Sequence, residues 1–391
     1  MARTRRLAGA ALLLLIPSLA WAEPPRVKPA SIRLVDGRYE ADLTDGGHAE
    51  LTLDPRLQTS TEDVLRAFQI RYAGAVVVSI PDGRVLALVG HSAADPRLGA
   101  QELALGAWAP SASVFKVVSA TALVEHGVSA STRVCYHGGV SAVLPDNLVD
   151  IPALDHRCDT LGYGLGKSQN AIIAKLVTQH LTAEDVARVG HTFGYGEAIP
   201  FELPVEPSSL DVPADALEMA RASAGFWHST LSPLHAALLA ATIANAGDMP
   251  APTLIDRAVD AGGRPEPTAI PAPRHVADAA AAAQVGHMME LTTRIGTARG
   301  TFRNKRGQRL LPVEVAGKTG TLAANTDRGP IGYSWFVGYA PADHPRIAFA
   351  VLLGNGPSWR IKATYVGRHI VGQYLAGRGG GHGRPGLVAA R

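Results

Sequence analysis

The chain has 391 residues, with 37 basic and 34 acidic side chains and a formal net charge of +3. Its length suffices for one large or two modest domains with an apolar core. Three of the basic residues, Arg3, Arg5 and Arg6, lie within the first 22 residues, which contain no acid, so the formal charge without that segment is zero. A neutral chain gives no reason to expect nucleic acid or an anionic membrane surface as a partner.

Residues 1–22 have the composition of a secretory signal peptide. The three arginines precede an apolar stretch over residues 7–21, and Ala20-Trp21-Ala22 has the small-x-small pattern of a cleavage site. An uncleaved membrane anchor is the alternative, but the stretch is shorter than the roughly 20 residues that a spanning helix needs, and it contains Pro17. We therefore expect an exported protein of the periplasm or cell envelope.

The next segment, residues 23–56, is predicted to form a short β-rich N-terminal extension. Turn sequences at Asp36-Gly37 and Asp45-Gly46-Gly47 separate short segments in which apolar and polar residues alternate. Residues 75–90 are predicted to form a β-hairpin, because two apolar runs flank the turn sequence Pro81-Asp82-Gly83.

A serine and a lysine three residues apart, Ser113 and Lys116, stand at the start of an apolar run over residues 114–124. The run predicts a buried helix, with Pro110 and Ser111 at its entrance. A serine hydroxyl needs a neighbouring base to act as a nucleophile, and residues three apart share one face of a helix. Burial lowers the pKa of a lysine and makes it a general base near neutral pH. The alternative is a helix start with a solvated lysine.

The chain has two cysteines, Cys135 and Cys158. In an exported protein the natural expectation is a disulfide, which would close a loop after the Ser113 helix. The alternative is a pair of buried thiols, because spacing alone does not bring two cysteines together.

Ser168-Gln169-Asn170 is a second motif that could carry chemistry. A second hydroxyl can pass a proton between a base and a leaving group, while an amide side chain can hold a peptide bond of a substrate. Taken alone, the same residues also suit a turn or a helix cap.

No cofactor or metal is predicted. Gly166-Lys167-Ser168 imitates the end of a phosphate-binding loop, but Leu161 stands where that motif needs its first glycine. The 14 histidines are scattered and show no His-Glu-x-x-His or cysteine–histidine ligand spacing, so we assign no metal site.

The second half of the chain predicts two helices, three strands and a tail. A helix with Ser232 as N-cap and Pro233 in its first turn ends near Gly247. The remaining predictions are strands at 313–321, 334–339 and 346–353, a helix at about 361–375, and a disordered glycine-rich tail at 377–391. Two early and three late strands with helices between them predict an α/β fold of the α+β type, with a five-stranded antiparallel sheet flanked by helices and an inserted all-helical subdomain.

Lys318-Thr319-Gly320-Thr321 lies on the first of these late strands. A glycine on an edge-like strand lets a ligand backbone approach closely, and the lysine and threonine side chains can hold a terminal carboxylate. The alternative is a β-turn with an exposed lysine.

The three motifs, in this order, resemble those of the superfamily of penicillin-binding proteins and serine β-lactamases. The resemblance extends from about Leu51 to Leu375, and residues 57–376 are predicted to be a penicillin-binding transpeptidase domain. Segments that support it include Leu51-Thr-Leu-Asp-Pro-Arg-Leu-Gln58, Ala109-Pro-Ser-Ala-Ser113, Ser232-Pro-Leu-His-Ala236, Ile243-Ala-Asn-Ala-Gly247 and Trp335-Phe-Val-Gly-Tyr-Ala-Pro341.

The resemblance implies a β-lactamase/transpeptidase-like fold and a role for each motif residue. Ser113 would be the acylated nucleophile, Lys116 its base and Ser168 the proton relay. Asn170 would bind the substrate backbone, and Lys318 would supply a positive field. Thr319, Gly320 and Thr321 would bind the substrate, with the threonines on its carboxylate, and the N–H groups of Ser113 and Thr321 would form the oxyanion hole.

The implied function is that of a D,D-transpeptidase acting on the D-Ala-D-Ala end of peptidoglycan stem peptides, with β-lactam antibiotics as covalent inhibitors. A D,D-carboxypeptidase is the main alternative, and a serine β-lactamase or a non-catalytic β-lactam-binding or scaffold module is a weaker one. Partner proteins in wall synthesis are unknown from the sequence.

Two departures from the family pattern remain. The roughly 30 residues between Ala22 and Leu51 are too few for a glycosyltransferase or pedestal domain, so we expect a stand-alone module. The segment 225–233, Gly-Phe-Trp-His-Ser-Thr-Leu-Ser-Pro, is bulkier and more aromatic than expected of the family. We expect it to pack against the core, and the alternative is that it lines a substrate groove.

Overall fold

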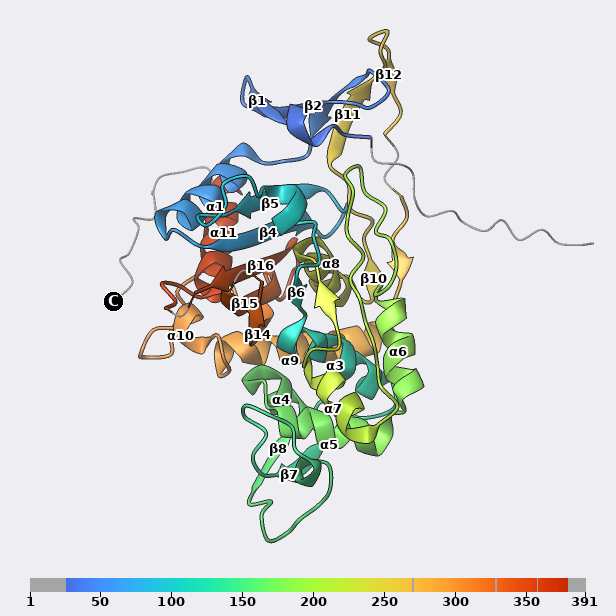
Figure 1. Ribbon diagram of the computed structural model, residues 1–391, viewed down its shortest axis with the longest axis vertical. Helices are drawn as coiled ribbons and strands as arrows, with labels where there is room; N and C mark the ends of the chain where they lie inside the picture. Colours follow the sequence, from blue (N-terminus) through green and yellow to red (C-terminus); the bar gives the residue numbers. More distant parts are fainter. Residues whose placement is uncertain (1–25, 269–270, 328, 357, 379–391) are drawn as a thin grey trace, which may run out of the picture.

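The computed structural model describes residues 26–268, 271–327, 329–356 and 358–378 (Figure 1). The predicted signal at 1–22 lies outside these residues, as does most of the predicted tail. Helix α11 (Ala363–Arg378) includes the first two residues of that tail, so the prediction that the tail begins at residue 377 is wrong. In the described part of the chain, no helix is both long and apolar enough to cross a membrane.

The central element is a five-stranded antiparallel sheet, as predicted, in the order β14-β15-β16-β4-β5. Its strands are β4 (Tyr72–Ser79), β5 (Val85–His91), β14 (Ala316–Thr326), β15 (Gly329–Ala340) and β16 (Ile347–Asn355). Every residue of β16 is buried, which explains its continuous apolar sequence.

Helices cover both faces of this sheet. Side chains of β4 alternate between two cores: Ala73, Ala75 and Val77 face the side covered by α1 (Pro55–Ala67) and α11, whereas Tyr72, Val76 and Val78 face the opposite core. That opposite face carries α8 (Pro233–Ala244) and α9 (Ala279–Arg294). Ser232 caps α8 as predicted, because its Oγ accepts a hydrogen bond from the N–H of His235.

A helical subdomain lies between the early and late strands and occupies the lower half of Figure 1. It contains α3 (Lys116–Glu125), α4 (Leu161–Lys167), α5 (Asn170–His180), α6 (Ala183–Thr192) and α7 (Ala216–Ala224). The prediction of an all-helical subdomain is wrong in one respect. Strands β7 (Arg133–Tyr136) and β8 (Arg157–Thr160) form a small antiparallel pair within it.

The predicted β-rich extension is present, and it pairs with a distant part of the chain. Its strands β1 (Arg33–Val35), β2 (Arg38–Asp42) and β3 (His48–Leu51) join β11 (Ile255–Val259) and β12 (Pro265–Glu266) in a second antiparallel sheet, at the top of Figure 1. Helix α1 begins at Pro55 and therefore crosses the predicted boundary at residue 56.

Short elements connect these layers. They are η1 (Pro29–Ser31), α2 (Ala100–Leu103), β6 (Ala109–Pro110), η2 (Ala112–Phe115), η3 (Pro145–Asn147), β9 (Thr230–Leu231), β10 (Asp248–Met249), β13 (Arg274–His275) and α10 (Arg299–Phe302). Of these, the 3₁₀ helix η2 contains Ser113 of the first motif.

A disulfide joins Cys135 and Cys158, which face each other across the β7–β8 pair. The bond closes a loop with a sequence separation of 23 residues. In the chain-entropy description such a cross-link stabilises the folded state by about 3 kcal/mol.

We therefore expect the double variant Cys135→Ser/Cys158→Ser to melt several degrees below the oxidised wild type, and at the same temperature as the reduced wild type. Differential scanning calorimetry with and without reductant measures this. Equal melting temperatures for the oxidised wild type and the double variant would contradict it.

Candidate active site

The three motifs meet in one cleft between the helical subdomain and β14. This cleft has a volume of about 610 Å³, and Ser113, Ser168, Asn170, Thr319 and Thr321 all line it. Lys116 and Lys318 lie fully buried directly behind these side chains. The structure thus brings together residues that are up to 208 positions apart in the chain, from Ser113 to Thr321.

Ser113 lies in a strained turn rather than in a regular helix. The predicted helix at 114–124 is preceded by η2, so its first turn is 3₁₀, and α3 starts at Lys116. Ala112 has a positive φ of 47°, which is unfavourable for a residue with a side chain. Two contacts hold this turn: the indole N–H of Trp335 donates to Pro110 O at 2.9 Å, and Gly225 packs so closely that a Cβ there would lie 1.9 Å from Ala112 O.

Lys116 is the centre of the site. Its Nζ lies 2.6 Å from Ser113 Oγ, 2.7 Å from Asn170 Oδ1 and 2.8 Å from Ala224 O. The side chain is fully buried, as the apolar run predicts. Burial, together with the nearby charge of Lys318, holds the pKa of Lys116 well below the ordinary lysine value.

The three contacts orient the amine. A neutral lysine has two N–H donors and one lone pair, and Ala224 O can only accept a hydrogen bond. Asn170 also presents an acceptor, because its Nδ2 donates to Val140 O at 3.2 Å, which turns Oδ1 toward Lys116. A neutral amine here would use both N–H donors on these two acceptors and would turn its lone pair toward Ser113 Oγ. This is the geometry of a base ready to take the serine proton.

A second buried lysine faces the second hydroxyl. Lys318 Nζ donates to Ser168 Oγ at 2.8 Å and to Thr319 O at 2.8 Å. Burial lowers the pKa of Lys318 to about 7. Ser168 ends helix α4 in a left-handed conformation with φ of 57°, which is uncommon for serine and directs its side chain into the cleft.

The remaining residues of the third motif lie along β14. Thr321 is exposed in the cleft, and the hydroxyls of Thr319 and Thr297 are hydrogen-bonded to each other. Gly320 is buried against the turn that carries Ser113, since a Cβ there would lie 3.3 Å from the Cβ of Ala112. A side chain at 320 would therefore crowd both Trp335 and the turn that carries Ser113.

The disulfide-closed loop forms one wall of the cleft, which the sequence did not predict. Its Gly139 O accepts a hydrogen bond from the N–H of Asn170, and Val140 lines the cleft. The loop is tied to α5 by Lys175, whose fully buried Nζ lies 2.8 Å from Asp155 Oδ2 and donates to Cys135 O at 2.8 Å. Burial opposes ionisation of Asp155, but hydrogen bonds from His137 and Lys175 hold its pKa well below its usual range.

The expectation that segment 225–233 packs against the core is only partly right. Phe226 packs against the small core of Val143 and Ala224, but it also lines the cleft. Trp227 is 56% exposed and adopts a positive φ of 57°, so it does not fill the core. The neighbouring His228 approaches Glu218 to 3.0 Å.

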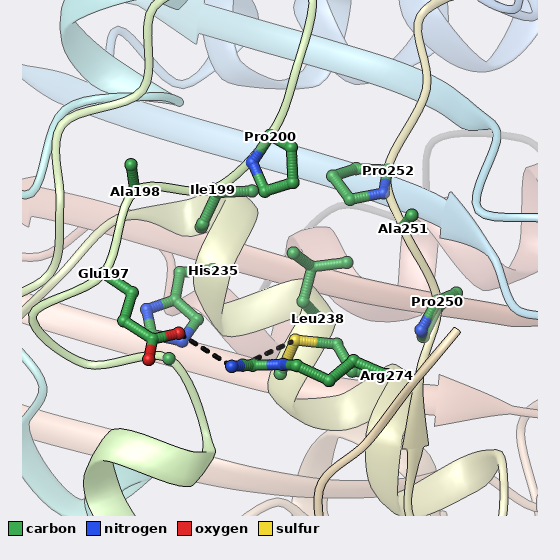
Figure 2. Close-up of a pocket in the computed structure, with 12 residues that line it drawn as sticks. Glu197, Ala198, Ile199, Pro200, His235, Leu238, Pro250, Ala251, Pro252 and Arg274 are labelled. Carbon is green, nitrogen blue, oxygen red and sulfur yellow. Dashed lines mark hydrogen bonds and ion pairs between the residues drawn. The ribbon is translucent and has the colours of Figure 1, made fainter. Parts of the chain in front are cut away.

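A second cavity, of about 380 Å³, lies apart from the motifs (Figure 2). Its described lining combines prolines and Leu238 with His235 and an ion pair in which Arg274 donates to Glu197 at 2.7 Å. It holds none of the motif residues, so the chemistry of the three motifs belongs to the other cleft.

Sequence reasoning missed several residues of the site. Ala224 and Val140 act through backbone carbonyls, which leave no side-chain signal in a sequence. Tyr136, Arg157 and Lys362 line the cleft from segments that contain no motif. One sequence signal could have revealed that Lys175 is buried and holds the disulfide-closed loop: it is a charged residue within an apolar helix.

The chain resembles known proteins over most of its length. The model of the family described as penicillin binding protein transpeptidase domain matches residues 73–372. The peptidoglycan D,D-transpeptidase PbpA of Mycobacterium tuberculosis is 27% identical over 405 residues, which cover 92% of this chain and 80% of that protein. PbpA of Mycolicibacterium smegmatis is 26% identical over 357 residues, which cover 82% of this chain and 69% of that protein.

Solved structures have the same fold. Penicillin-binding protein A of M. tuberculosis in its imipenem acyl-enzyme complex superposes with a TM-score of 0.69 at 24% identity, covering 84% of this chain and 80% of that one. These comparisons confirm the predicted fold class, and with the family match they establish that the chain belongs to the penicillin-binding protein transpeptidase domain family.

Proposed function

We propose that this protein is an exported D,D-transpeptidase that cross-links peptidoglycan stem peptides ending in D-Ala-D-Ala through an acyl-enzyme on Ser113. The observation that carries the proposal is the buried Lys116 amine, whose Nζ lies 2.6 Å from Ser113 Oγ. The name of the mycobacterial relatives, peptidoglycan D,D-transpeptidase, supports the substrate. The apolar, arginine-led residues 1–22 support export.

In the first step Ser113 Oγ gives its proton to Lys116 Nζ and attacks the carbonyl carbon between the two D-Ala residues. The resulting oxyanion would be held by the backbone N–H groups of Ser113 and Thr321. Loss of one such donor typically costs on the order of a hundredfold or more in rate. Thr319 and Thr321 would hold the terminal carboxylate, and Asn170 would hold the peptide backbone.

In the second step the peptide bond breaks and the terminal D-Ala leaves with the proton from Lys116. Ser168 would relay that proton, and its place in the same cleft as Ser113, with its Oγ hydrogen-bonded to Lys318, supports this role. The acyl group stays on Ser113 until an amine of a second stem peptide attacks it, which gives the cross-link.

A D,D-carboxypeptidase shares every step up to the acyl-enzyme and differs only in using water as the acceptor. Mass spectrometry of products from a D-Ala-D-Ala stem peptide, offered with and without an amine acceptor, separates the two. A cross-linked product supports the transpeptidase, whereas a shortened peptide formed at the same rate in both reactions supports the carboxypeptidase.

Ser113 is expected to be the residue that penicillin acylates, because a strained amide meets the same nucleophile and base as the substrate. Fluorescent penicillin should label the wild type, and Ser113→Ala should abolish the label. Ser141→Ala is a matched control from the same cleft wall and should keep it. Labelling of Ser113→Ala would mean that another serine is the nucleophile.

The penicilloyl-enzyme is expected to be long-lived, so that β-lactams inhibit this protein rather than being destroyed by it. Fast hydrolysis needs a second base that activates water, and the described lining of the cleft contains no aspartate or glutamate. The class A β-lactamase pattern Glu-x-x-x-Asn is also missing, since residues 171–230 contain no asparagine. Intact-mass spectrometry of the adduct and nitrocefin turnover measure this. Turnover well above about one per second would favour a β-lactamase instead.

Lys116→Met is expected to lower the acylation rate by roughly 10²- to 10⁴-fold, because the general base is lost. It should also change the pH dependence of stability. The pKa of Lys116 is lower in the folded than in the unfolded state, so the folded wild type binds fewer protons and gains stability as pH rises toward the ordinary lysine pKa.

The melting temperature of the wild type relative to Lys116→Met should therefore increase between about pH 7 and pH 10. The control variant Lys305→Met replaces an exposed lysine, and its melting temperature should change with pH as that of the wild type does. A constant difference between wild type and Lys116→Met across this range would show that Lys116 is charged in the folded protein.

A further inference from the structure

The catalytic cleft is lined by cations of three separate elements. Arg157 lies on β8, Lys167 ends α4, and Lys362 immediately precedes α11. All three side chains are exposed, and the described residues lining the same cleft include no aspartate or glutamate. The whole chain, by contrast, has 37 basic and 34 acidic residues, so the cleft concentrates positive charge in an otherwise balanced protein.

These cations are not neutralised by neighbouring carboxylates in the described structure. None of the three takes part in a salt bridge there, although many surface arginines do, such as Arg188 with Asp185. The nearby Asp159 accepts a hydrogen bond from the Tyr136 phenol at 2.9 Å. Lys167 Nζ lies over the ring of Tyr163 at 6.0 Å, a cation–π contact that does not neutralise its charge.

The cations also stand on both sides of the cleft. Arg157 and Lys167 belong to the helical subdomain, whereas Lys362 lies beside the central sheet, together with Thr364 and Trp335. A bound peptide therefore experiences positive potential from both walls. The threonines of the third motif already account for one carboxylate, at the end of the substrate, and leave these three exposed cations unused.

We infer that the cleft selects donor peptides that carry a free carboxylate in the residue preceding D-Ala-D-Ala, over donors in which that group is an amide or an amine. This inference deepens the proposed function and rests on it. Opposite charges in a cleft raise the local concentration of the ligand and its rate of association, while like charges oppose binding. Arg157, Lys167 and Lys362 are thus specificity-determining residues.

The test uses three synthetic donors that differ only in one side chain: N-acetyl-L-Glu-D-Ala-D-Ala and its L-Gln and L-Lys counterparts. Release of D-Ala gives kcat/KM for each. We expect the Glu donor to react several-fold faster than the Gln donor, and the Lys donor to be slowest. The Glu-to-Gln ratio should fall as salt rises from about 20 mM to about 500 mM, because salt screens exposed charges.

The triple variant Arg157→Gln/Lys167→Gln/Lys362→Gln should bring the Glu-to-Gln ratio close to one. A matched control, Arg33→Gln/Arg38→Gln/Arg257→Gln, removes the same charge from the exposed face of the N-terminal sheet and should keep the wild-type ratio. Thermal melting of both variants checks that they are folded.

The outcomes separate the two claims. If no donor releases D-Ala and penicillin does not acylate Ser113, the proposed function fails. If all donors react at equal rates in the wild type, or if the two triple variants change the ratio equally, the proposed function stands and the selection for a free carboxylate is wrong.

Discussion

The fold is organised around one amine in three hydrogen-bonding contacts. Lys116 reaches the serine of its own helical turn, a side chain at the start of α5 and a carbonyl at the end of α7. These contacts form only if three helices converge on one point, and an amine buried without its partners would strongly destabilise the folded state. The helical subdomain therefore both encloses the amine and holds it against Ser113 Oγ.

A second constraint comes from placing two lysines in one buried site. Each charge opposes the other, and burial disfavours the charged form of both. Burial lowers the pKa of Lys318 to about 7, and burial together with the Lys318 charge holds the pKa of Lys116 well below the ordinary lysine value. Burying two lysines lowers the stability of the folded state, and the large apolar cores on both faces of the sheet offset that loss.

Much of the fold and of the candidate site was predictable from the sequence, because these parts depend on local patterns. The five strands, the capped helix at Ser232 and the three motifs each have a signal within a few residues of sequence. The pairing of β3 with β11 has no such local signal in the sequence, since about 200 residues separate Leu51 from Ile255. The contact of Ala224 O with Lys116 was equally hidden, because any residue has a carbonyl and only the packing of Gly225 against the nucleophile turn brings this one into place.

The position of β14 in the sheet has a consequence for solubility. It pairs with β15 on one side, and in the described part of the chain its other side faces the cleft. An open strand edge is a template for pairing with a second copy, and long flat edges promote aggregation. Here the turn that carries Ser113 packs against the middle of the strand, at Gly320, and the loop bearing Val140 lines the same cleft. These two segments thus cover part of the open edge of β14 and hinder pairing with a strand of a second copy.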